Sequence, residues 1–357
     1  MKPLKYLFIS SMLFVATSCG NSWLDLEPST SVDTETSIKI LSDVEFTLNG
    51  IYSTMQSSDA YSGRLVYYGD VTGDDMQAVS STKRVANYYR FNFTKDDNPS
   101  SHWSYLYSII QNCNLILMNI DKLAIDEEDK AYRDDLKGEA LAIRGLALFD
   151  LTRIFGYPYL KDNGASLGVP IIEGLSTIDS KPTRNTVAQC YTKIIDDLTQ
   201  SISLLGEKFN KGKINKWGAM VLLSRVYLYK GENANALKMA GDAITGAEKN
   251  KYALWTNEDY PTAWGEDASA SKPGEVLFEI VNLTTDSPGK ESMGYLNSYD
   301  GYDDMCITCS FYQFLKEDPK DIRLKLLSFD KKYYAYVNKY KPQSEENIED
   351  ANIPLIS

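Results

Sequence analysis

The sequence predicts a mainly α-helical protein, built from tetratricopeptide-like helical hairpins and carrying a loop-rich region with little β structure. Residues 213–247 first repeat apolar side chains and then alanines at intervals of three and four, with Gly231 between the two halves. Alanines at this spacing let neighbouring helices approach closely, as stacked hairpins do. The order of residues matches a tetratricopeptide unit, and an ordinary antiparallel helix pair is the alternative. From residue 251 onward, aromatic residues are instead scattered among Gly, Pro, Asp and Ser, which predicts loops.

The composition limits the classes of protein to consider. The chain has 357 residues, 43% of them hydrophobic, which is enough to bury a large core. Its net charge of −12 and the lack of a basic stripe argue against a nucleic-acid partner. Tyrosine is abundant, with 25 residues beside 12 Phe and 5 Trp. Tyrosine has an apolar ring and a polar tip, so it suits binding surfaces as well as cores.

The first residues predict export and a lipid anchor. Residues 1–18 combine a basic start with an apolar run that is too short to span a bilayer, as in a signal peptide. The ending Ala16-Thr17-Ser18-Cys19 resembles a lipobox, although Ala16 replaces the usual Leu. We therefore expect lipidation at Cys19, where each buried methylene contributes about 0.8 kcal/mol. Ordinary cleavage with an incidental Cys19 is the alternative. Residues 19–35 are polar and read as the lipidated tether.

Residues 36–250 are expected to form the helical region. Apolar periodicity predicts helices at 37–56, 99–123, 126–156, 185–205 and, as a pair, within 213–247. Asp126 is expected to cap its helix, whose first turn is acidic. Trp103, Trp217 and Tyr227 lie on apolar stripes and are assigned to the core. Residues 63–94 have no clear helical period and are expected to form loops.

Residues 251–357 are expected to be loop-rich, with short strands at 275–281 and 333–340. The second of these segments alternates aromatic and other residues. The region would thus add only a small amount of β structure to the helical scaffold.

Several short motifs occur in a characteristic order along the chain. They are the Cys19 leader, WLDLEP at 23–28, QNCN at 111–114, NID at 119–121, Glu139-Ala140 with Arg144-Gly145, and RIFGYP at 153–158. In this combination the sequence resembles the SusD/RagB-like outer-membrane lipoproteins of Bacteroidota. The resemblance implies a tetratricopeptide-containing scaffold with a glycan-binding loop face. It also implies a SusC-like TonB-dependent outer-membrane transporter as partner and a position at the cell surface. The lack of a phosphate-binding loop and of a nucleophile motif argues against most enzyme classes, and we expect no cofactor.

The resemblance has one departure. Family members usually continue beyond a motif like Asn352 to Ile356 into a helix that closes the repeat array, whereas this sequence stops at Ser357. Residues 251–357 are therefore expected to be truncated at their C-terminal end. A non-functional truncated product is one alternative to a working binding protein.

Sugar binding needs flat aromatic surface and side chains that hydrogen-bond hydroxyl groups. Two loop-rich segments offer both. The candidate ligand-binding residues are Tyr67, Tyr68, Arg84, Asn87, Tyr88 and Tyr89 in the first segment, and Trp264, Tyr295, Tyr299 and Tyr302 in the second. For each of them, structural packing is the alternative to ligand contact.

Other chemistry has weaker support. Asp74-Asp75 and Asp303-Asp304 are adjacent pairs that point in different directions, unlike the separated carboxylates of a glycoside hydrolase. No EF-hand loop is present for calcium. Cys306 and Cys309 form a CxxC, but the only histidine, His102, is far away in sequence, so we expect no metal site. Incidental thiols or a disulfide remain for these cysteines.

The sequence thus predicts a non-enzymatic, cell-surface lipoprotein that binds an oligosaccharide and delivers it to a TonB-dependent transporter. A peptide-binding member of the same family is one alternative. A helical-repeat scaffold that binds only protein is another.

Overall fold

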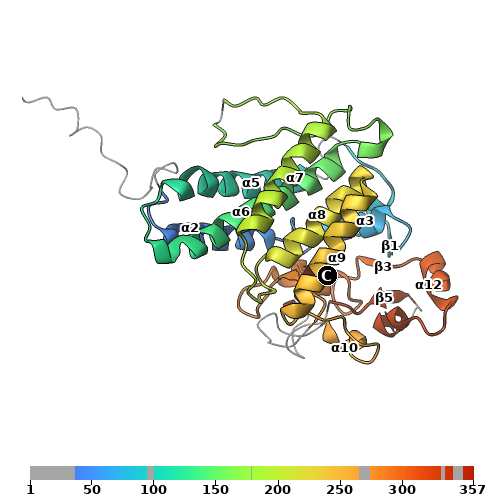
Figure 1. The fold of residues 1–357 in the computed structure, drawn as a ribbon. Helices are drawn as coiled ribbons and strands as arrows, with labels where there is room; N and C mark the ends of the chain where they lie inside the picture. Colours follow the sequence, from blue (N-terminus) through green and yellow to red (C-terminus); the bar gives the residue numbers. More distant parts are fainter. Residues whose placement is uncertain (1–36, 95–99, 178, 265–273, 331–333, 341–348) are drawn as a thin grey trace, which may run out of the picture.

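The computed structural model describes residues 37–94, 100–177, 179–264, 274–330, 334–340 and 349–357. The predicted signal peptide and the whole predicted tether, which includes Cys19, lie outside the described residues. Figure 1 shows a mainly helical molecule, and the expectation of a mainly α fold is confirmed. Among the described residues, no helix is both long and apolar enough to cross a membrane.

Long helices form one layered array in the first two thirds of the chain. They are α2 (Leu41–Met55), α5 (Ser100–Asn119), α6 (Lys130–Phe155), α7 (Val187–Leu204), α8 (Lys216–Lys230) and α9 (Asn233–Lys249). Helix α6 packs between α5 and α7, and α8 packs between α7 and α9. The helices predicted at 37–56, 99–123, 185–205 and 213–247 are therefore confirmed.

Helix α6 is the centre of the array, and nearly every residue from Leu136 to Thr152 is buried. Its glycines permit close packing. A Cβ at Gly145 would lie 3.0 Å from Leu198 Cγ of α7, and one at Gly138 would lie 2.8 Å from Leu205 Cγ. Small residues at the contact thus allow two helix backbones to approach.

The hairpin of α8 and α9 has the expected tetratricopeptide-like packing. Gly231 ends α8 with a φ of 85°, a left-handed conformation that suits glycine. Ala236, Ala243 and Ala247 are the buried residues of α9. Trp217 of α8 is buried as predicted, whereas Trp103 and Tyr227 are partly buried against the core.

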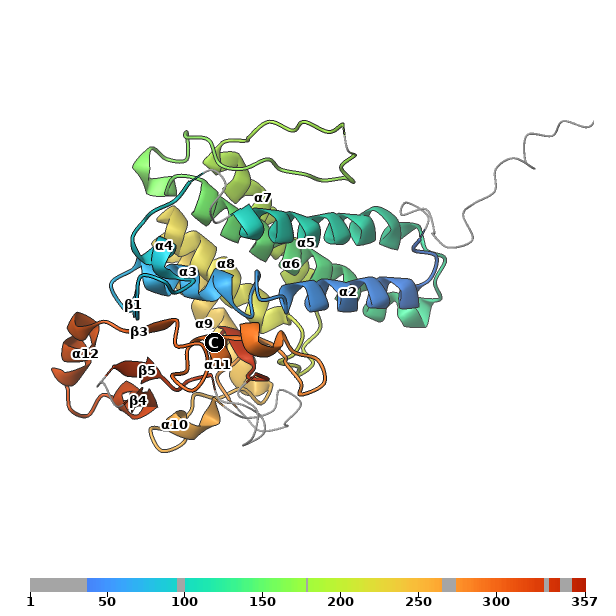
Figure 2. The same cartoon turned by 180° about the vertical axis from the view of Figure 1, so that it is seen from behind.

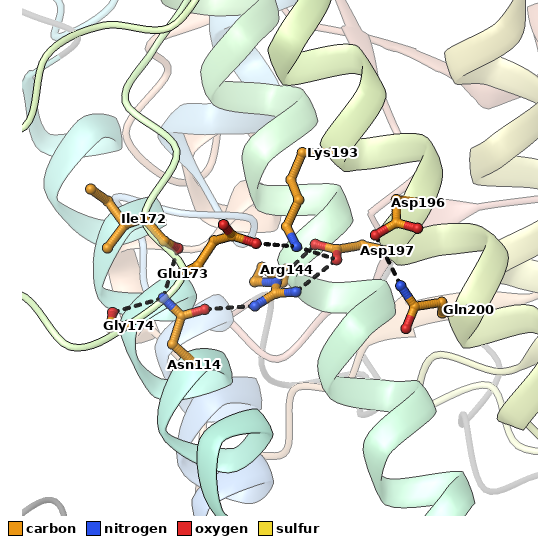
Figure 3. A network of polar contacts seen from close by, with 9 residues as sticks. All are labelled: Asn114, Arg144, Ile172, Glu173, Gly174, Lys193, Asp196, Asp197 and Gln200. Carbon is orange, nitrogen blue, oxygen red and sulfur yellow. Dashed lines mark hydrogen bonds and ion pairs between the residues drawn. The ribbon is translucent and has the colours of Figure 1, made fainter.

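Charged side chains also lie inside the array. Arg144 of α6 hydrogen-bonds Asp197 of α7 and Asn114 of α5 (Figure 3). Lys193 of α7 completes the network through ion pairs with Glu173 and Asp197. The network therefore joins three helices and the segment that follows residue 170.

Short elements make up the remainder of the described chain. The helices are α3 (Arg64–Thr72), α4 (Ala86–Tyr89), α10 (Tyr260–Ala263), α11 (Met293–Leu296) and α12 (Cys309–Lys316). The 3-10 turns are η3 (Ile120–Lys122), η4 (Glu127–Asp129), η5 (Tyr159–Lys161), η6 (Gly289–Glu291) and η7 (Ile322–Leu326). The strands are β1 (Met76–Ala78), β2 (Phe278–Ile280), β3 (Met305–Ile307), β4 (Leu327–Phe329), β5 (Ala335–Val337) and β6 (Ile353–Ile356).

The strands form three separate antiparallel pairs, β1 with β3, β2 with β6 and β4 with β5. Strand β2 lies within the segment predicted at 275–281, and β5 lies within the segment predicted at 333–340. The partners of these two strands were not predicted.

Two expectations about local structure are wrong. Residues 63–94 contain α3, β1 and α4 instead of loops only, because Tyr67 and Val71 place a buried stripe on a short helix. Asp126 makes no side-chain capping bond, because η4 precedes α6. Helix α7 has instead a capping box, in which Thr186 accepts from the backbone N–H of Gln189.

Candidate functional site

Strand β1 brings the two predicted aromatic segments together. It pairs with β3 so that Met76 lies opposite Ile307 and Ala78 lies opposite Met305. Gln77 and Cys306, also paired here, are 229 residues apart in the sequence. Figure 2 shows β1 and β3 side by side below α3 and α4. The chain that follows β1 therefore meets the chain that precedes β3.

Arg84 is the central contact between these segments. Its guanidinium carbon lies 3.8 Å from the centroid of the Tyr302 ring, a cation–π distance. Nη1 donates to Glu291 Oε1 at 2.8 Å and to Oε2 at 2.9 Å. Partial burial acts to lower the pKa of Arg84, but its contacts with Tyr302 and Glu291 raise it above the usual value. The arginine is thus a held, charged group that remains about one third exposed.

A second aromatic ring packs against Tyr302. The Tyr295 ring packs edge-to-face against Tyr302 with centroids 5.0 Å apart, and both rings are half-buried. Lys290 Nζ lies 5.8 Å from the Tyr295 centroid. The arrangement offers aromatic surface with cationic groups at its edge.

Tyr299 extends the surface towards β5. Its ring is 45% exposed and lies 5.7 Å from the ring of buried Tyr336. The Tyr336 hydroxyl donates to Asp303, whose second oxygen lies 3.7 Å from Lys83 Nζ. Burial, followed by this contact with Asp303, raises the pKa of Tyr336. The carboxylate of Asp303 is therefore fixed beside an exposed ring.

We name these residues together the Arg84 face. Its members are Lys83, Arg84, Glu291, Tyr295, Tyr299, Tyr302 and Asp303. The sequence-based candidates omitted Lys83, Glu291 and Asp303 as ligand contacts. Lys83 adjoins Arg84 in the chain, but nothing in the sequence marked Glu291, because its role depends on the long-range pairing of β1 with β3.

Three of the aromatic residues predicted to bind ligand lie in the interior. Tyr67 and Tyr88 are each 1% exposed and contact each other with centroids 5.9 Å apart. Trp264 is also buried, between Trp255 and Tyr260. The expectation that these three rings are accessible is wrong, because each one fills an aromatic cluster under short helices.

The remaining candidates, Tyr68, Asn87 and Tyr89, belong to helices α3 and α4. Tyr68 is half-buried and packs edge-to-face on Tyr88 at 5.5 Å. His102, also in this cluster, is buried, and burial lowers its pKa. Asn87 is half-buried, and Tyr89 is 39% exposed.

The described residues do not show an arrangement typical of metal binding. Within them, no group of three or more His, Cys, Asp or Glu side chains is placed to hold a metal ion. Cys306 is buried in β3, Cys309 is exposed at the start of α12, and both are free thiols. Of the two alternatives for the CxxC, the structure therefore has free thiols.

The two acidic pairs, Asp74-Asp75 and Asp303-Asp304, directly precede strands β1 and β3. Asp304 is buried, and burial raises the pKa of its carboxyl group although Arg84 and Lys83 oppose this. The backbone carbonyl oxygens of Asp74 and Asp75 accept from the Thr308 hydroxyl at the start of α12. Asp304 is thus held inside the β1–β3 junction, whereas the contacts of Asp74 and Asp75 with Thr308 involve only their backbone.

A helical-repeat scaffold that holds an aromatic surface edged by charges is typical of binding proteins. Residues 22–228 match the SusD-like family, which is described as starch-binding and associating with the outer membrane. The chain belongs to this family.

Solved structures agree with this assignment. A putative sugar binding protein from Bacteroides vulgatus is 82% identical with a TM-score of 0.88, and the match covers 90% of this chain and 72% of that one. A SusD superfamily protein from the same organism is 36% identical with a TM-score of 0.84, and the match covers 89% and 73% of the two chains.

Curated relatives are more distant. SusD-like protein P2 from Formosa agariphila is 28% identical over 313 residues, which are 84% of this chain and 57% of that protein. The chain spans about half the length of the curated relatives that it matches.

Proposed function

We propose that this protein binds an oligosaccharide at the cell surface through the Arg84 face. The main support is the contact of Arg84 with Tyr302, because it places a partly exposed, hydrogen-bonding cation against an aromatic ring. Sugars present apolar C–H faces to rings and hydroxyl groups to charged or polar side chains. The family description as starch-binding and the sugar-binding name of the 82% identical relative support this assignment.

The protein acts in this proposal as a carrier and not as an enzyme. It would be anchored in the outer membrane by lipid on Cys19, with its binding surface facing outward. It would pass its ligand to a SusC-like TonB-dependent transporter, without a cofactor and without a nucleic-acid partner. The family's association with the outer membrane supports the location.

Calorimetric titration against plant and host glycans tests the proposal, with a peptide panel titrated alongside. We expect at least one oligosaccharide to bind wild-type protein, and Tyr299→Ala to weaken that binding. Tyr157→Ala is the matched control, because Tyr157 is an exposed tyrosine that lies next to Lys161, outside the Arg84 face. Binding of peptides alone would favour the peptide-import alternative. Silence in both panels, with retained transporter binding, would favour a protein-interaction scaffold.

The anchor is tested separately. Cells that express the full chain and receive labelled palmitate should yield labelled protein, and Cys19→Ser should abolish the label. Label that persists in Cys19→Ser would contradict the assignment of the anchor.

A further inference from the structure

A cavity of about 380 Å³ lies between α3, α6 and α8, and it shares no residue with the Arg84 face. Figure 2 shows α3 in front of α8 in this part of the molecule. The volume is at the lower end of the roughly 300–1,000 Å³ of small-molecule pockets. It would therefore hold a group about the size of a single sugar unit.

The cavity has an aromatic and charged lining. Its rings are Tyr61, Tyr68 and Tyr229, and its charged groups are Asp150, Arg153 and Arg225. Two guanidinium groups thus face one carboxylate. Since the chain as a whole carries a charge of −12, this is a local positive region in an acidic protein.

The carboxylate of Asp150 is already satisfied. Tyr61 donates its hydroxyl hydrogen to Asp150 Oδ2 at 2.7 Å, and Arg153 forms an ion pair with Oδ1. Asp150 is buried, and Arg153 also lies 4.8 Å from the Phe149 ring centroid. Asp150 and Arg153 therefore neutralise each other within the cavity wall.

Arg225 is left as the uncompensated charge. It is half-buried, and it makes no hydrogen bond or ion pair with any residue that the structure describes. Burial lowers the pKa of Arg225. The charge of Asp150 acts to raise this pKa, and the like charge of Arg153 acts to lower it. An unpaired charge removed from water is destabilising, so an anion that enters the cavity would relieve this cost.

We propose that this cavity binds a hexuronate, with the sugar carboxylate held by Arg225. The planar guanidinium matches a carboxylate with two parallel hydrogen bonds. The rings of Tyr68 and Tyr229 provide apolar surface for the sugar, and a bare anion would leave that surface unused. The cavity would give the protein a preference for acidic saccharides that the Arg84 face does not explain.

The full chain, titrated with galacturonate, glucuronate, galactose, glucose and sodium acetate at equal ionic strength, tests this proposal. We expect the two uronates to bind and the neutral sugars and acetate not to bind. Arg225→Met keeps the length of the side chain without its charge and should weaken uronate binding at least tenfold. Arg225→Lys should bind with intermediate affinity. Lys238→Gln, which removes an exposed charge from α9, should bind like wild-type protein.

Thermal unfolding gives an independent measurement. Without ligand, Arg225→Met should unfold at the same temperature as wild-type protein or a higher one, since the uncompensated charge is gone. Galacturonate should raise the unfolding temperature of wild-type protein and of Lys238→Gln, but not that of Arg225→Met.

Three results would overturn the proposal: no uronate binding, equal stabilisation by acetate, or unchanged affinity in Arg225→Met. Neutral oligosaccharide binding by Arg225→Met reports separately on the Arg84 face, so failure of one site is distinguishable from failure of the other.

Discussion

Arg144 and Asp197 form a two-fold hydrogen-bonded ion pair in the interior of the helical array. Arg144 Nε donates to Asp197 Oδ2 at 2.8 Å, and Nη2 donates to Oδ1 at 2.7 Å. The Arg144 side chain is 8% exposed and that of Asp197 is fully buried. The remaining Nη1 donates to Asn114 Oδ1, and Asn114 in turn donates to the carbonyl oxygens of Ile172 and Gly174 (Figure 3). One arginine thereby links α5, α6 and α7.

The first prediction concerns this network. Asp197→Asn removes the charge that pairs with buried Arg144, and a buried ion pair that loses one partner costs about 3 kcal/mol or more. Urea denaturation should show a loss of that size. Asp196→Asn is the matched control, because the neighbouring Asp196 is exposed and accepts a hydrogen bond from Gln200 Nε2 at 2.9 Å. We expect the control to change the stability by less than about 0.5 kcal/mol. Equal stability of both variants would contradict the role of the pair.

The second prediction compares two glycines of α9. A Cβ at Gly246 would lie 2.0 Å from Trp217 Cζ3, so Gly246→Ala must displace a buried indole ring. Overpacking of this kind costs roughly 1–3 kcal/mol. At Gly241 nothing lies within 4 Å of the added methyl group, so Gly241→Ala should stabilise the protein by up to about 1 kcal/mol through helix propensity. Thermal unfolding of both variants measures the contrast, and a loss of stability in Gly241→Ala would be inconsistent with this packing.

The helical array was predictable from the sequence because its signals are local. The helix predicted at 185–205 is observed as Val187–Leu204, and Gly231 separates α8 from α9 as its position indicates. Apolar periodicity and a left-handed glycine act within a few residues. By contrast, α3 was missed because Gly69 and Asp70 interrupt its short apolar stripe.

The candidate site was predictable only in part. Arg84, Tyr295, Tyr299 and Tyr302 were named from their residue types, and the structure brings Arg84 and Tyr302 into contact. The same reasoning also named Tyr67 and Tyr88, whose burial follows from packing that composition does not report. Contacts such as Arg84 with Glu291 depend on strand pairing across more than two hundred residues, for which a single sequence carries no local signal.

The third prediction concerns the pH dependence of stability. Glu139 is buried in α6 and accepts from the Tyr52 hydroxyl at 2.8 Å. Burial raises the pKa of Glu139 from 4.5 to about 7, although Lys213 and Tyr52 oppose the change. Between these values the folded protein binds more protons than the unfolded chain, so stability falls as the pH rises from 4.5 to 7. At 1.36 kcal/mol per pKa unit, the titration of Glu139 lowers the free energy of unfolding by about 3 kcal/mol over this range.

Glu139→Gln keeps an acceptor for Tyr52 and removes the titration. Urea denaturation at several pH values should therefore show that the variant gains stability relative to wild-type protein as the pH rises from 4.5 to 7, with no difference in slope outside that range. Glu128→Gln, at an exposed position, should follow the wild-type curve. A constant difference between Glu139→Gln and wild-type protein across the range would show that Glu139 does not titrate there.

The fourth prediction separates the ring of Tyr302 from its hydroxyl group. Arg84 lies over this ring, and a hydrogen bond between the two side chains also helps to raise the pKa of Arg84. Tyr302→Phe keeps the aromatic surface and the cation–π contact, so it should retain most of the affinity for a bound oligosaccharide. Tyr302→Ala removes both and should weaken binding about tenfold, the loss expected for one aromatic contact of about 1.4 kcal/mol.

Calorimetry of the two variants, with circular dichroism to establish that both are folded, makes this comparison. Glu291→Gln adds a further variant, because it removes the ion pair between Arg84 and Glu291 and makes the Arg84 face one charge more positive. If the ligand carries no charge, the affinity of Glu291→Gln should change less than that of Tyr302→Ala. Wild-type affinity in Tyr302→Ala would instead place the oligosaccharide away from the Arg84 face, since Arg84 lies directly over this ring.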